Sequence, residues 1–453
     1  MEDYITRTHK IHISKNSKQY KHAYKILDDA CFKSKNLYNR ALYTERQYFF
    51  KTNRTLSYSD LYKILKEEDS FKQLNSLKSG LSQQTLKLTA QSMTAFTKAT
   101  KVYNNNPSKF TGMPELPKYL RKSTGRQILD FTYTLFRVTN NKLLLTLNNN
   151  TLEFNIPSYL NGIVKQTQSK QTFTLEDLDQ KQPDLTLNQV RIIPKHLSYD
   201  LELVYTRKIN KPEHTNTNNN PASIDLGVNN FITLVYLQPN IDPVIYSGKY
   251  LKSYNKNFNK KLAKLQSKID TAENNNQPNL NTLMNQREQL YQKRNQYFNT
   301  NLHQISNLII RDLIKNNVTQ LIIGYNKQWK TESKLHKKTN QTFVQIPYLH
   351  LIQILKYKAK EIGITVFETE EKHTSGASFL DQEQPTKQNY NKSRRIHRGL
   401  FRSATNQLIN ADVNAAYQIT KKIYPQLNTI QPDIFRYQHP KTVILPKTFK
   451  QVA

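Results

Sequence analysis

The spacing of apolar residues divides the chain into two halves with different patterns. From Ser17 to about residue 102, apolar residues recur at helical spacing, with a break at Gly80 and a helix start at Ser57. Period-two runs bracket this helical stretch, and they predict short strands at 5–14, 128–134, 142–147, 152–156, 190–194 and 199–205. Turns rich in Asn and Pro separate these strands. The pattern favours a small β-barrel, with the helical unit as an insertion.

The second half alternates between strands and helices. Residues 222–236 read as a hairpin with a tight turn between Gly227 and Asn230. Further elements are predicted as a helical hairpin at 252–298, a helix at 301–315, a strand at 318–323, a helix at 346–362, a strand at 364–369 and a helix at 411–423. This alternation predicts an α/β layer fold with some parallel pairing. A polar linker at 209–221 separates the halves.

The net charge of the chain indicates which class of partner it binds. Its 453 residues are enough for two or three domains, and its formal net charge is +33. Such an excess favours a polyanionic partner, RNA or DNA, over a merely soluble basic protein. A membrane-surface protein is disfavoured because no basic amphipathic anchor stands out, and no apolar signal or spanning segment is evident. We therefore expect an intracellular protein. Cys31 is the only cysteine, which excludes an intramolecular disulfide and a multi-cysteine zinc site.

Three acidic residues are candidates for metal chemistry. Asp225 lies in a predicted buried strand, where a carboxylate is costly unless it is paired. Asp412 begins the last helix, and Glu371 lies between them in the sequence. Taken alone, Asp412 could be only a helix cap, and the glutamates could be a solvated strand end. Together they fit a two-metal phosphodiesterase site, since Mg²⁺ prefers oxygen ligands and crowded carboxylates repel one another without metal.

Four segments resemble the TnpB (OrfB) family of transposon-encoded, RNA-guided DNA endonucleases, which are related to the type V CRISPR effectors. These segments are Ser-Ile-Asp225-Leu-Gly, Ile-Ile-Gly324-Tyr-Asn-Lys-Gln-Trp329-Lys, Glu370-Glu371-Lys-His-Thr374-Ser, and Arg398-Gly-Leu-Phe followed by Asn410-Ala-Asp412-Val-Asn414-Ala-Ala. A Pro-rich segment at 110–119 adds to the resemblance, which therefore covers most of the chain.

The resemblance implies a wedge-type β-barrel with an inserted helical bundle, followed by an RNase H-like (RuvC) α/β nuclease domain. The expected segments are 1–16 and 104–208 for the barrel, 17–103 for the helical recognition unit, 209–221 for the linker, 222–425 for the nuclease domain with its helical hairpin 252–298 and basic loop 376–410, and 426–453 for a C-terminal tail.

The family also implies an activity and a set of partners. We expect Mg²⁺-dependent cleavage of double-stranded target DNA, with two ions held by Asp225, Glu371 and Asp412. A guide RNA from the protein's own locus would direct this cleavage. The ribonucleoprotein is expected to contain a single copy of the chain and to associate with the nucleoid in a prokaryotic cytoplasm. Two alternatives are a catalytically inactive, RNA-guided repressor and a transposase that performs strand transfer itself.

Two departures from the family pattern concern its metals. The family usually carries its second acidic residue at the end of the strand 318–323, where this chain has Gly324. Glu371 is the natural substitute, Glu370 remains an alternative, and Glu368 is a weaker third, because period-two reasoning does not decide among them. Many relatives also carry four zinc-binding cysteines before the last Asp, whereas residues 376–410 contain none. We therefore expect no zinc there.

Nucleic-acid contacts are expected from basic and aromatic side chains. Beside a nuclease site in so basic a chain, phosphate contact is favoured over a solvated charge run. The candidates are Arg394, Arg395, Arg398 and Arg402 in the basic loop, and Lys118 and Tyr119 in the Pro-rich segment. Trp329, the single tryptophan, is expected in a core.

Overall fold

The chain forms two compact units, Met1–Ile209 and Asn210–Ala453. The computed structural model describes residues 4–110, 112–165, 185–209, 220–238, 240–325, 345–426 and 434–444. The predicted linker lies largely outside the described residues, as does the end of the second motif, including Trp329. None of the described helices is both long and apolar enough to cross a membrane.

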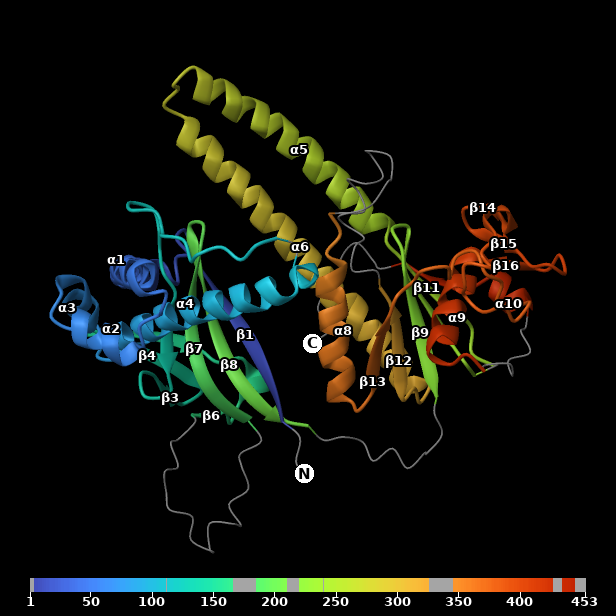
Figure 1. Ribbon diagram of the computed structural model, residues 1–453, viewed down its shortest axis with the longest axis horizontal. Coiled ribbons are helices and arrows are strands. Elements are labelled where there is room, and N and C mark those ends of the chain that lie inside the picture. Colours follow the sequence, from blue (N-terminus) through green and yellow to red (C-terminus); the bar gives the residue numbers. More distant parts are fainter. Residues whose placement is uncertain are drawn as a thin grey trace, which may run out of the picture. The chain divides into compact units, whose positions relative to one another are not determined.

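Four α-helices form one side of the first unit (Figure 1). They are α1 (Lys21–Thr52), α2 (Tyr58–Leu65), α3 (Asp69–Asn75) and α4 (Leu81–Asn105). The predicted start at Ser57 is confirmed, since Ser57 and Asp60 form a reciprocal capping box. Gly80 precedes α4 with a φ of +96°, a left-handed conformation that favours glycine. The short helix α3 was not predicted.

The strands of this unit lie close to the predicted positions. One sheet has the order β1 (Tyr4–Ser14), β8 (Ser198–Lys208), β7 (Leu185–Lys195) and β2 (Leu129–Thr132), with β6 (Val164–Lys165) also paired to β7. A separate meander contains β3 (Arg137–Thr139), β4 (Lys142–Leu147) and β5 (Asn150–Asn155). The described strands thus form two sheets that no ladder joins. A closed barrel is therefore not confirmed, and β3 and β6 were missed because they are too short for a periodic signal.

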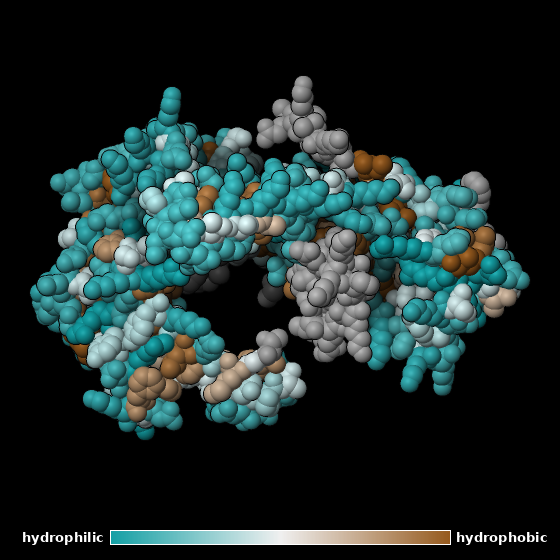
Figure 2. Space-filling model, turned by 90° about the horizontal axis from the view of Figure 1, so that it is seen from above, coloured by the Kyte–Doolittle hydropathy of each residue, from teal (hydrophilic) through white to brown (hydrophobic). Residues whose placement is uncertain are grey.

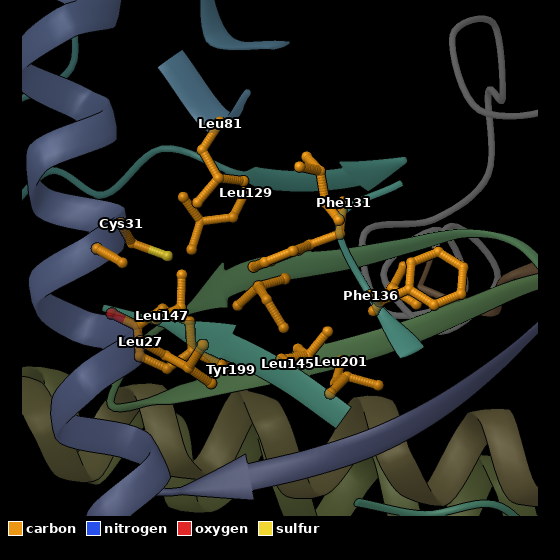
Figure 3. Packing of buried hydrophobic residues seen from close by; sticks show 14 of the residues in the cluster. Leu27, Cys31, Leu81, Leu129, Phe131, Phe136, Leu145, Leu147, Tyr199 and Leu201 are labelled. Carbon is orange, nitrogen blue, oxygen red and sulfur yellow. The ribbon is translucent and has the colours of Figure 1, made fainter. Parts of the chain in front are cut away.

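Helices and strands of the first unit share one hydrophobic core. Leu27 and Cys31 from α1 meet Leu129 from β2, Leu145 from β4 and Leu201 from β8 (Figure 3). All five are at most 1% exposed. The helical segment 17–103 is therefore not a separately packed body, because its apolar face is buried against the two sheets.

A six-stranded mixed sheet organises the second unit. Its order is β13 (Thr365–Thr369), β12 (Gln320–Gly324), β9 (Pro221–Leu226), β10 (Asn230–Tyr236), β11 (Val244–Ser247) and β17 (Lys441–Val443). β9, β10 and β11 pair antiparallel, whereas β12 is parallel to β9 and β13 is parallel to β12. β17 pairs in parallel with β11, so part of the segment expected as a tail belongs to this sheet.

Helices cover both faces of this sheet. The helices are α5 (Lys249–Asn274), α6 (Leu280–Lys315), α8 (Tyr348–Glu361), α9 (Ala411–Ile423) and α10 (Ile434–Gln438). Apolar residues of α6 and α8 pack with Ile224 of β9, and Val413 and Tyr417 of α9 pack with Val235 of β10. The prediction of a separate helix at 301–315 was wrong. α6 is one helix of 36 residues, since no Gly or Pro interrupts it.

The segment 376–410 is more ordered than the basic loop that was predicted. It contains the antiparallel strands β14 (Arg395–His397), β15 (Leu400–Arg402) and β16 (Leu408–Asn410). Phe401 and Ile409 are fully buried and pack with Phe379 and Tyr417. An apolar cluster therefore helps to hold this small sheet together.

Candidate active site

The alternation of β9 directs Asp225 toward α9. Ala222, Ile224 and Leu226 belong to the core under α6 and α8. Ser223 points the other way, where its hydroxyl donates to the Ala416 carbonyl oxygen of α9 at 2.6 Å. Because alternate residues of a strand share a face, Asp225 lies on the same face as Ser223.

Asp412 occupies the first turn of α9 but does not cap the helix. The side chain of Asn410 accepts hydrogen bonds from the backbone N–H groups of Asp412 and Val413 and is therefore the N-cap. The Asp412 carboxylate is instead held by two side chains. Asn230 donates to Oδ2 at 2.6 Å, and the Arg395 guanidinium lies 3.2 Å from Oδ1. The cap role that the sequence left open for Asp412 thus falls to Asn410.

Asp225 and Asp412 are electrostatically unfavourable neighbours. Burial and then the Asp412 carboxylate raise the pKa of Asp225, while Arg395 lowers it in part. A carboxyl group that resists ionisation in this way gains from a nearby cation, because the cation stabilises its charged form.

Glu371 belongs to the segment that follows β13, the strand at one edge of the sheet. It follows β13 by two residues and begins a turn in which the Thr374 hydroxyl donates to its carbonyl oxygen at 2.8 Å. Burial and the Asp225 carboxylate raise the pKa of Glu371, although a backbone hydrogen bond from Leu226 opposes this shift. Its Oε1 atom is buried and has no hydrogen-bond partner. An unpartnered carboxylate oxygen beside a second carboxylate is costly unless a ligand completes it.

Gly324 leaves the room that Glu371 occupies. A Cβ atom added to Gly324 would lie 2.8 Å from Cγ and 3.0 Å from Oε1 of Glu371, and it would also contact Cδ1 of Ile419. The position where the family usually has an acidic side chain is thus filled from the neighbouring chain segment. Glu371 can occupy this space because residue 324 has no side chain.

The other two candidate glutamates lie elsewhere. Glu368 forms an ion pair with Lys356 at 2.7 Å on the α8 side, and Glu370 is exposed to solvent. The Asp225 carboxylate, by contrast, raises the pKa of Glu371.

The predicted nucleic-acid contacts fall into two groups. Arg394 is already engaged, at 2.7 Å from Glu383 and 3.8 Å from Asp381. Arg395 binds Asp412 and the carbonyl oxygen of Arg398.

The remaining candidates are more open to solvent. The side chains of Arg398 and Arg402 are exposed. Lys118 is also exposed and pairs with Glu115 at 2.6 Å, while the ring of Tyr119 packs under the Arg46 guanidinium. Phosphate contact by these residues stays a prediction.

The acidic residues fit a hard cation by their chemistry, although they are not a preassembled cage. Among the described residues, no three His, Cys, Asp or Glu side chains come close enough together to hold a metal ion. The Asp412 carboxylate nevertheless raises the pKa of Asp225, and the Asp225 carboxylate raises the pKa of Glu371. The orphaned Oε1 of Glu371 and the raised pKa of Asp225 both favour a cation between carboxylates.

Two positioning residues were missed by sequence reasoning. Asn230, at the hairpin turn, orients Asp412 as described above. Asn414 is fully buried, accepts a hydrogen bond from the Phe379 backbone and donates to the Ala377 carbonyl oxygen. It thereby ties the segment after Glu371 to α9. Its place two residues after Asp412 in the fourth motif was a usable signal.

Comparisons with known proteins support the resemblance. Residues 203–330 match the family described as OrfB_IS605, probable transposase, and residues 348–419 match the Cas12f1-like TNB domain. Two parts of the chain are therefore similar to a transposase family and to a domain of Cas12f1-like proteins. These two segments contain Asp225 and Gly324 in one case and Glu371 and Asp412 in the other. No curated protein matches this chain.

Solved structures of low sequence identity also align with it. A Cas12f1–sgRNA–target DNA complex is 13% identical over 92% of this chain and 98% of that one, with a TM-score of 0.32. A CRISPR–Cas12f ternary complex is 13% identical over 88% and 82%, with a TM-score of 0.35. C2c1 from Alicyclobacillus acidoterrestris with single-guide RNA is 10% identical over 90% and 68%, with a TM-score of 0.35.

Proposed function

We propose that this protein is an RNA-guided DNA endonuclease that hydrolyses phosphodiester bonds with two divalent cations, held by Asp225, Glu371 and Asp412. The observation that carries the proposal is the electrostatic coupling of Asp225 to both other carboxylates, with the buried Oε1 of Glu371 left unpartnered. A fold does not normally retain such repulsion in a core unless a cation or a substrate relieves it.

The strand order supports an RNase H-like nuclease domain. Three antiparallel strands, β9 to β11, are extended on the β9 side by two parallel strands, β12 and β13. Asp225 comes from the central strand, Glu371 follows the outermost one, and Asp412 begins a helix packed on the sheet. Side chains from such separate elements are held by the whole fold, which suits a site that must keep its geometry during turnover.

The chain's own residues divide the work around the ions. Bound Mg²⁺ would activate water and stabilise the leaving oxygen. Asp225, Glu371 and Asp412 would supply carboxylate oxygens to the ions, and Asn230 fixes the Asp412 carboxylate by its 2.6 Å hydrogen bond. Arg395 brings a permanent positive charge to the same carboxylate, where it can also meet the negative charge of a phosphate.

Guide RNA and target DNA are the partners that the charge supports. A net charge of +33 favours phosphate backbones, and hydrophilic residues dominate the face of the molecule in Figure 2. If base pairing with a guide RNA selects the target, the protein itself has to read only a short adjacent duplex motif. We further propose the barrel, recognition and nuclease segments given above as the functional division.

Two other functions have specific support. Gly324 in place of the usual acidic residue favours a guided repressor that does not cut DNA. The match to probable transposases favours strand transfer by the same carboxylates. Product analysis separates both from an endonuclease, because a repressor leaves the DNA intact and a transposase joins strands.

The test is cleavage of a plasmid target library in Mg²⁺ by protein co-purified with RNA from its own locus. We expect cutting beside a fixed short motif, and loss of cutting in EDTA and in Glu371→Gln. Glu368→Gln and Glu370→Gln are matched controls, since each removes one nearby carboxylate charge. Both should retain at least about half of the wild-type rate, because Glu368 is paired with Lys356 and Glu370 is exposed to solvent.

Three other outcomes would identify a different catalytic residue or a different function. Cutting that survives Glu371→Gln but not Glu370→Gln moves the catalytic role to Glu370. RNA-dependent binding of the target without any cutting establishes the repressor, and joined strands establish the transposase.

A further inference from the structure

Helix α5 carries a one-sided row of lysines that the proposed cleavage reaction does not use. Five of them are spaced by four residues, and two more lie on the same side. The row consists of Lys252, Lys256, Lys260, Lys264 and Lys268, with Lys249 and Lys261 beside it. All seven side chains are exposed, whereas the opposite side of the helix buries Leu251, Phe258 and Ile269. We call the five regularly spaced residues the lysine row.

The lysine row lies on a rigid support. α5 and the first part of α6 form an antiparallel arm that extends beyond the sheet of the second unit (Figure 1). The rings of Tyr254 and Tyr297 stack at 3.7 Å across the arm. Arg294 of α6 donates to Asn255 at 2.9 Å and lies over the rings of Phe258 and Phe298. These contacts fix the rotation of α5, so its basic face is presented in one orientation.

The positive charge of this face is not neutralised within the described part of the chain. Both acidic residues of α5, Asp270 and Glu273, lie at its C-terminal end, and Asp270 accepts a hydrogen bond from Gln266. Lys252 donates to the Asn229 amide oxygen at 3.0 Å, which leaves its charge uncompensated. No carboxylate of the described residues is paired with a lysine of the row.

The spacing of the row suits a phosphate backbone. With a rise of about 1.5 Å per residue, neighbouring lysines are separated by about 6 Å along the helix, and the row spans about 24 Å. Each step of four residues also turns by about 40°, so the row forms a slowly winding ridge. A nucleic-acid strand likewise presents regularly spaced anions along a winding path.

The chemistry of this face indicates contact with the backbone rather than with bases. Arginine, which reads guanine through paired hydrogen bonds, and exposed aromatic rings, which stack on bases, are absent from the basic side of α5. Ser253, Asn257 and Ser267 are exposed between the lysines. Their hydroxyl and amide groups can donate to and accept from the 2′-hydroxyl of RNA, a group that DNA lacks.

We propose that the basic face of α5 binds the sugar–phosphate backbone of duplex RNA, as a docking surface for a stem of the guide RNA. The assignment of the stem to a guide rests on the proposed function, whereas binding of duplex RNA rests on α5 alone. The contact is independent of sequence and lies outside the carboxylate site.

The test is a titration of the full-length protein with a short RNA duplex of arbitrary sequence and with the DNA duplex of the same sequence. The variant carries Lys→Gln at all five positions of the lysine row. A matched control carries Lys→Gln at five exposed lysines outside α5 and outside the helical recognition unit, and these are Lys15, Lys195, Lys315, Lys360 and Lys441. Both variants lose the same net charge. Unchanged thermal melting checks that each remains folded.

We expect the row variant to lose at least about 10-fold in affinity for the RNA duplex near 100 mM salt, and its plot of log K against log salt to flatten by several units, because each phosphate contact contributes about 0.7–0.9 to the slope. The control variant should lose no more than about threefold. Lys→Arg at the five row positions should restore most of the affinity, since charge and not geometry of a single contact is needed.

Three results would overturn the proposal: equal losses in the two Lys→Gln variants, a larger loss for the DNA duplex than for the RNA duplex, or no loss at all. The readout does not involve cleavage. A protein that binds RNA through the row and does not cut DNA would refute the proposed endonuclease and leave this inference standing.

Discussion

Two acidic residues, one in each unit, show how differently the fold treats a carboxylate. Asp28 of α1 receives two hydrogen bonds from the Arg126 guanidinium, at 2.9 and 2.8 Å, and one from the Tyr199 hydroxyl at 2.5 Å. Burial alone would raise its pKa, but these donors and the charge of Arg126 lower it below the ordinary value. Asp28 thus joins α1, β8 and the segment before β2 as an ionised, satisfied group.

Asp225 has the opposite environment. Burial and the Asp412 carboxylate raise its pKa, Arg395 only partly opposes this shift, and the Asp225 carboxylate in turn raises the pKa of Glu371. Donors satisfy Asp28, whereas Asp225 lies beside a second carboxylate, and Glu371 keeps one oxygen without a hydrogen-bond partner. The difference separates a structural acid from candidate metal ligands more sharply than burial does, because both residues are partly buried.

The largest expected effect comes from the same substitution at these two positions. Asp225→Asn should lower the cleavage rate by about 10³-fold or more, equivalent to about 4 kcal/mol of transition-state stabilisation. In EDTA it should leave the free energy of unfolding unchanged or raise it by about 1 kcal/mol, because it removes like-charge repulsion. Asp28→Asn should lower the free energy of unfolding by about 2 kcal/mol, since it weakens charge-assisted hydrogen bonds. Denaturant unfolding and plasmid cleavage measure the two quantities.

Mg²⁺ sharpens this comparison. Added Mg²⁺ should raise the melting temperature of the wild type and of Asp28→Asn, because a ligand that binds only the folded state stabilises it. It should raise that of Asp225→Asn much less. Equal destabilisation by both substitutions in EDTA would mean that Asp225 is a structural residue like Asp28.

How far the sequence predicts this arrangement depends on how local each signal is. Asp225 and Asp412 were found because a strand before a glycine turn and a capped helix start are short-range patterns. The choice among Glu368, Glu370 and Glu371 was not accessible in this way. β13 ends at Thr369, so the period-two rule no longer applies at Glu371, whose direction is set by the turn to Thr374.

Contacts between residues far apart in the sequence could not be predicted either. Arg394 looked like a free phosphate ligand, but the path of the chain brings Glu383 and Asp381 to it. The three residues of β17 gave no periodic signal, and their strand exists because β11 offers an open edge. The contact between Gly324 and Glu371 likewise depends on two neighbouring strands and could only be inferred as a substitution of one acid for another.

A second effect, of intermediate size, concerns Glu45, a buried acidic residue that accepts fewer hydrogen bonds than Asp28. Glu45 of α1 is 0% exposed, accepts one hydrogen bond from the Leu56 backbone at 3.0 Å, and leaves its Oε1 atom without a partner. Burial raises its pKa from 4.5 to about 7, and Asp60 adds to this shift. Between these values the folded state holds a proton that the unfolded state has lost. The stability contribution of Glu45 is therefore complete below about pH 4.5 and falls as the pH rises to about 7.

Glu45→Gln should remove this dependence. At pH 8 the variant should be more stable than the wild type by at most about 3 kcal/mol, whereas at pH 4.5 the two should be nearly equal. Unfolding free energies across this range, taken as the difference between variant and wild type, isolate Glu45 from the other titrating groups. A difference that stays constant with pH would show that the pKa of Glu45 is the same in the folded and unfolded states.

The smallest effect tests whether Glu371 occupies the space that the missing side chain of Gly324 leaves. Gly324→Ala places a methyl group against Glu371 and Ile419, and overpacking of this kind costs about 1–2 kcal/mol. Ile419→Val removes the Cδ1 atom, which is the nearest contact, so the double variant Gly324→Ala/Ile419→Val retains the conflict with Glu371. Gly399→Ala is the matched control, because a Cβ atom there meets nothing within 4 Å. We expect the double variant to weaken Mn²⁺ binding, measured by paramagnetic relaxation, while Gly399→Ala leaves it unchanged. In a Glu371→Gly/Ile419→Val background, Gly324→Ala should lose most of its cost in unfolding free energy. If the cost persists there, the methyl group meets something other than Glu371, and the room at residue 324 is unrelated to the displaced glutamate.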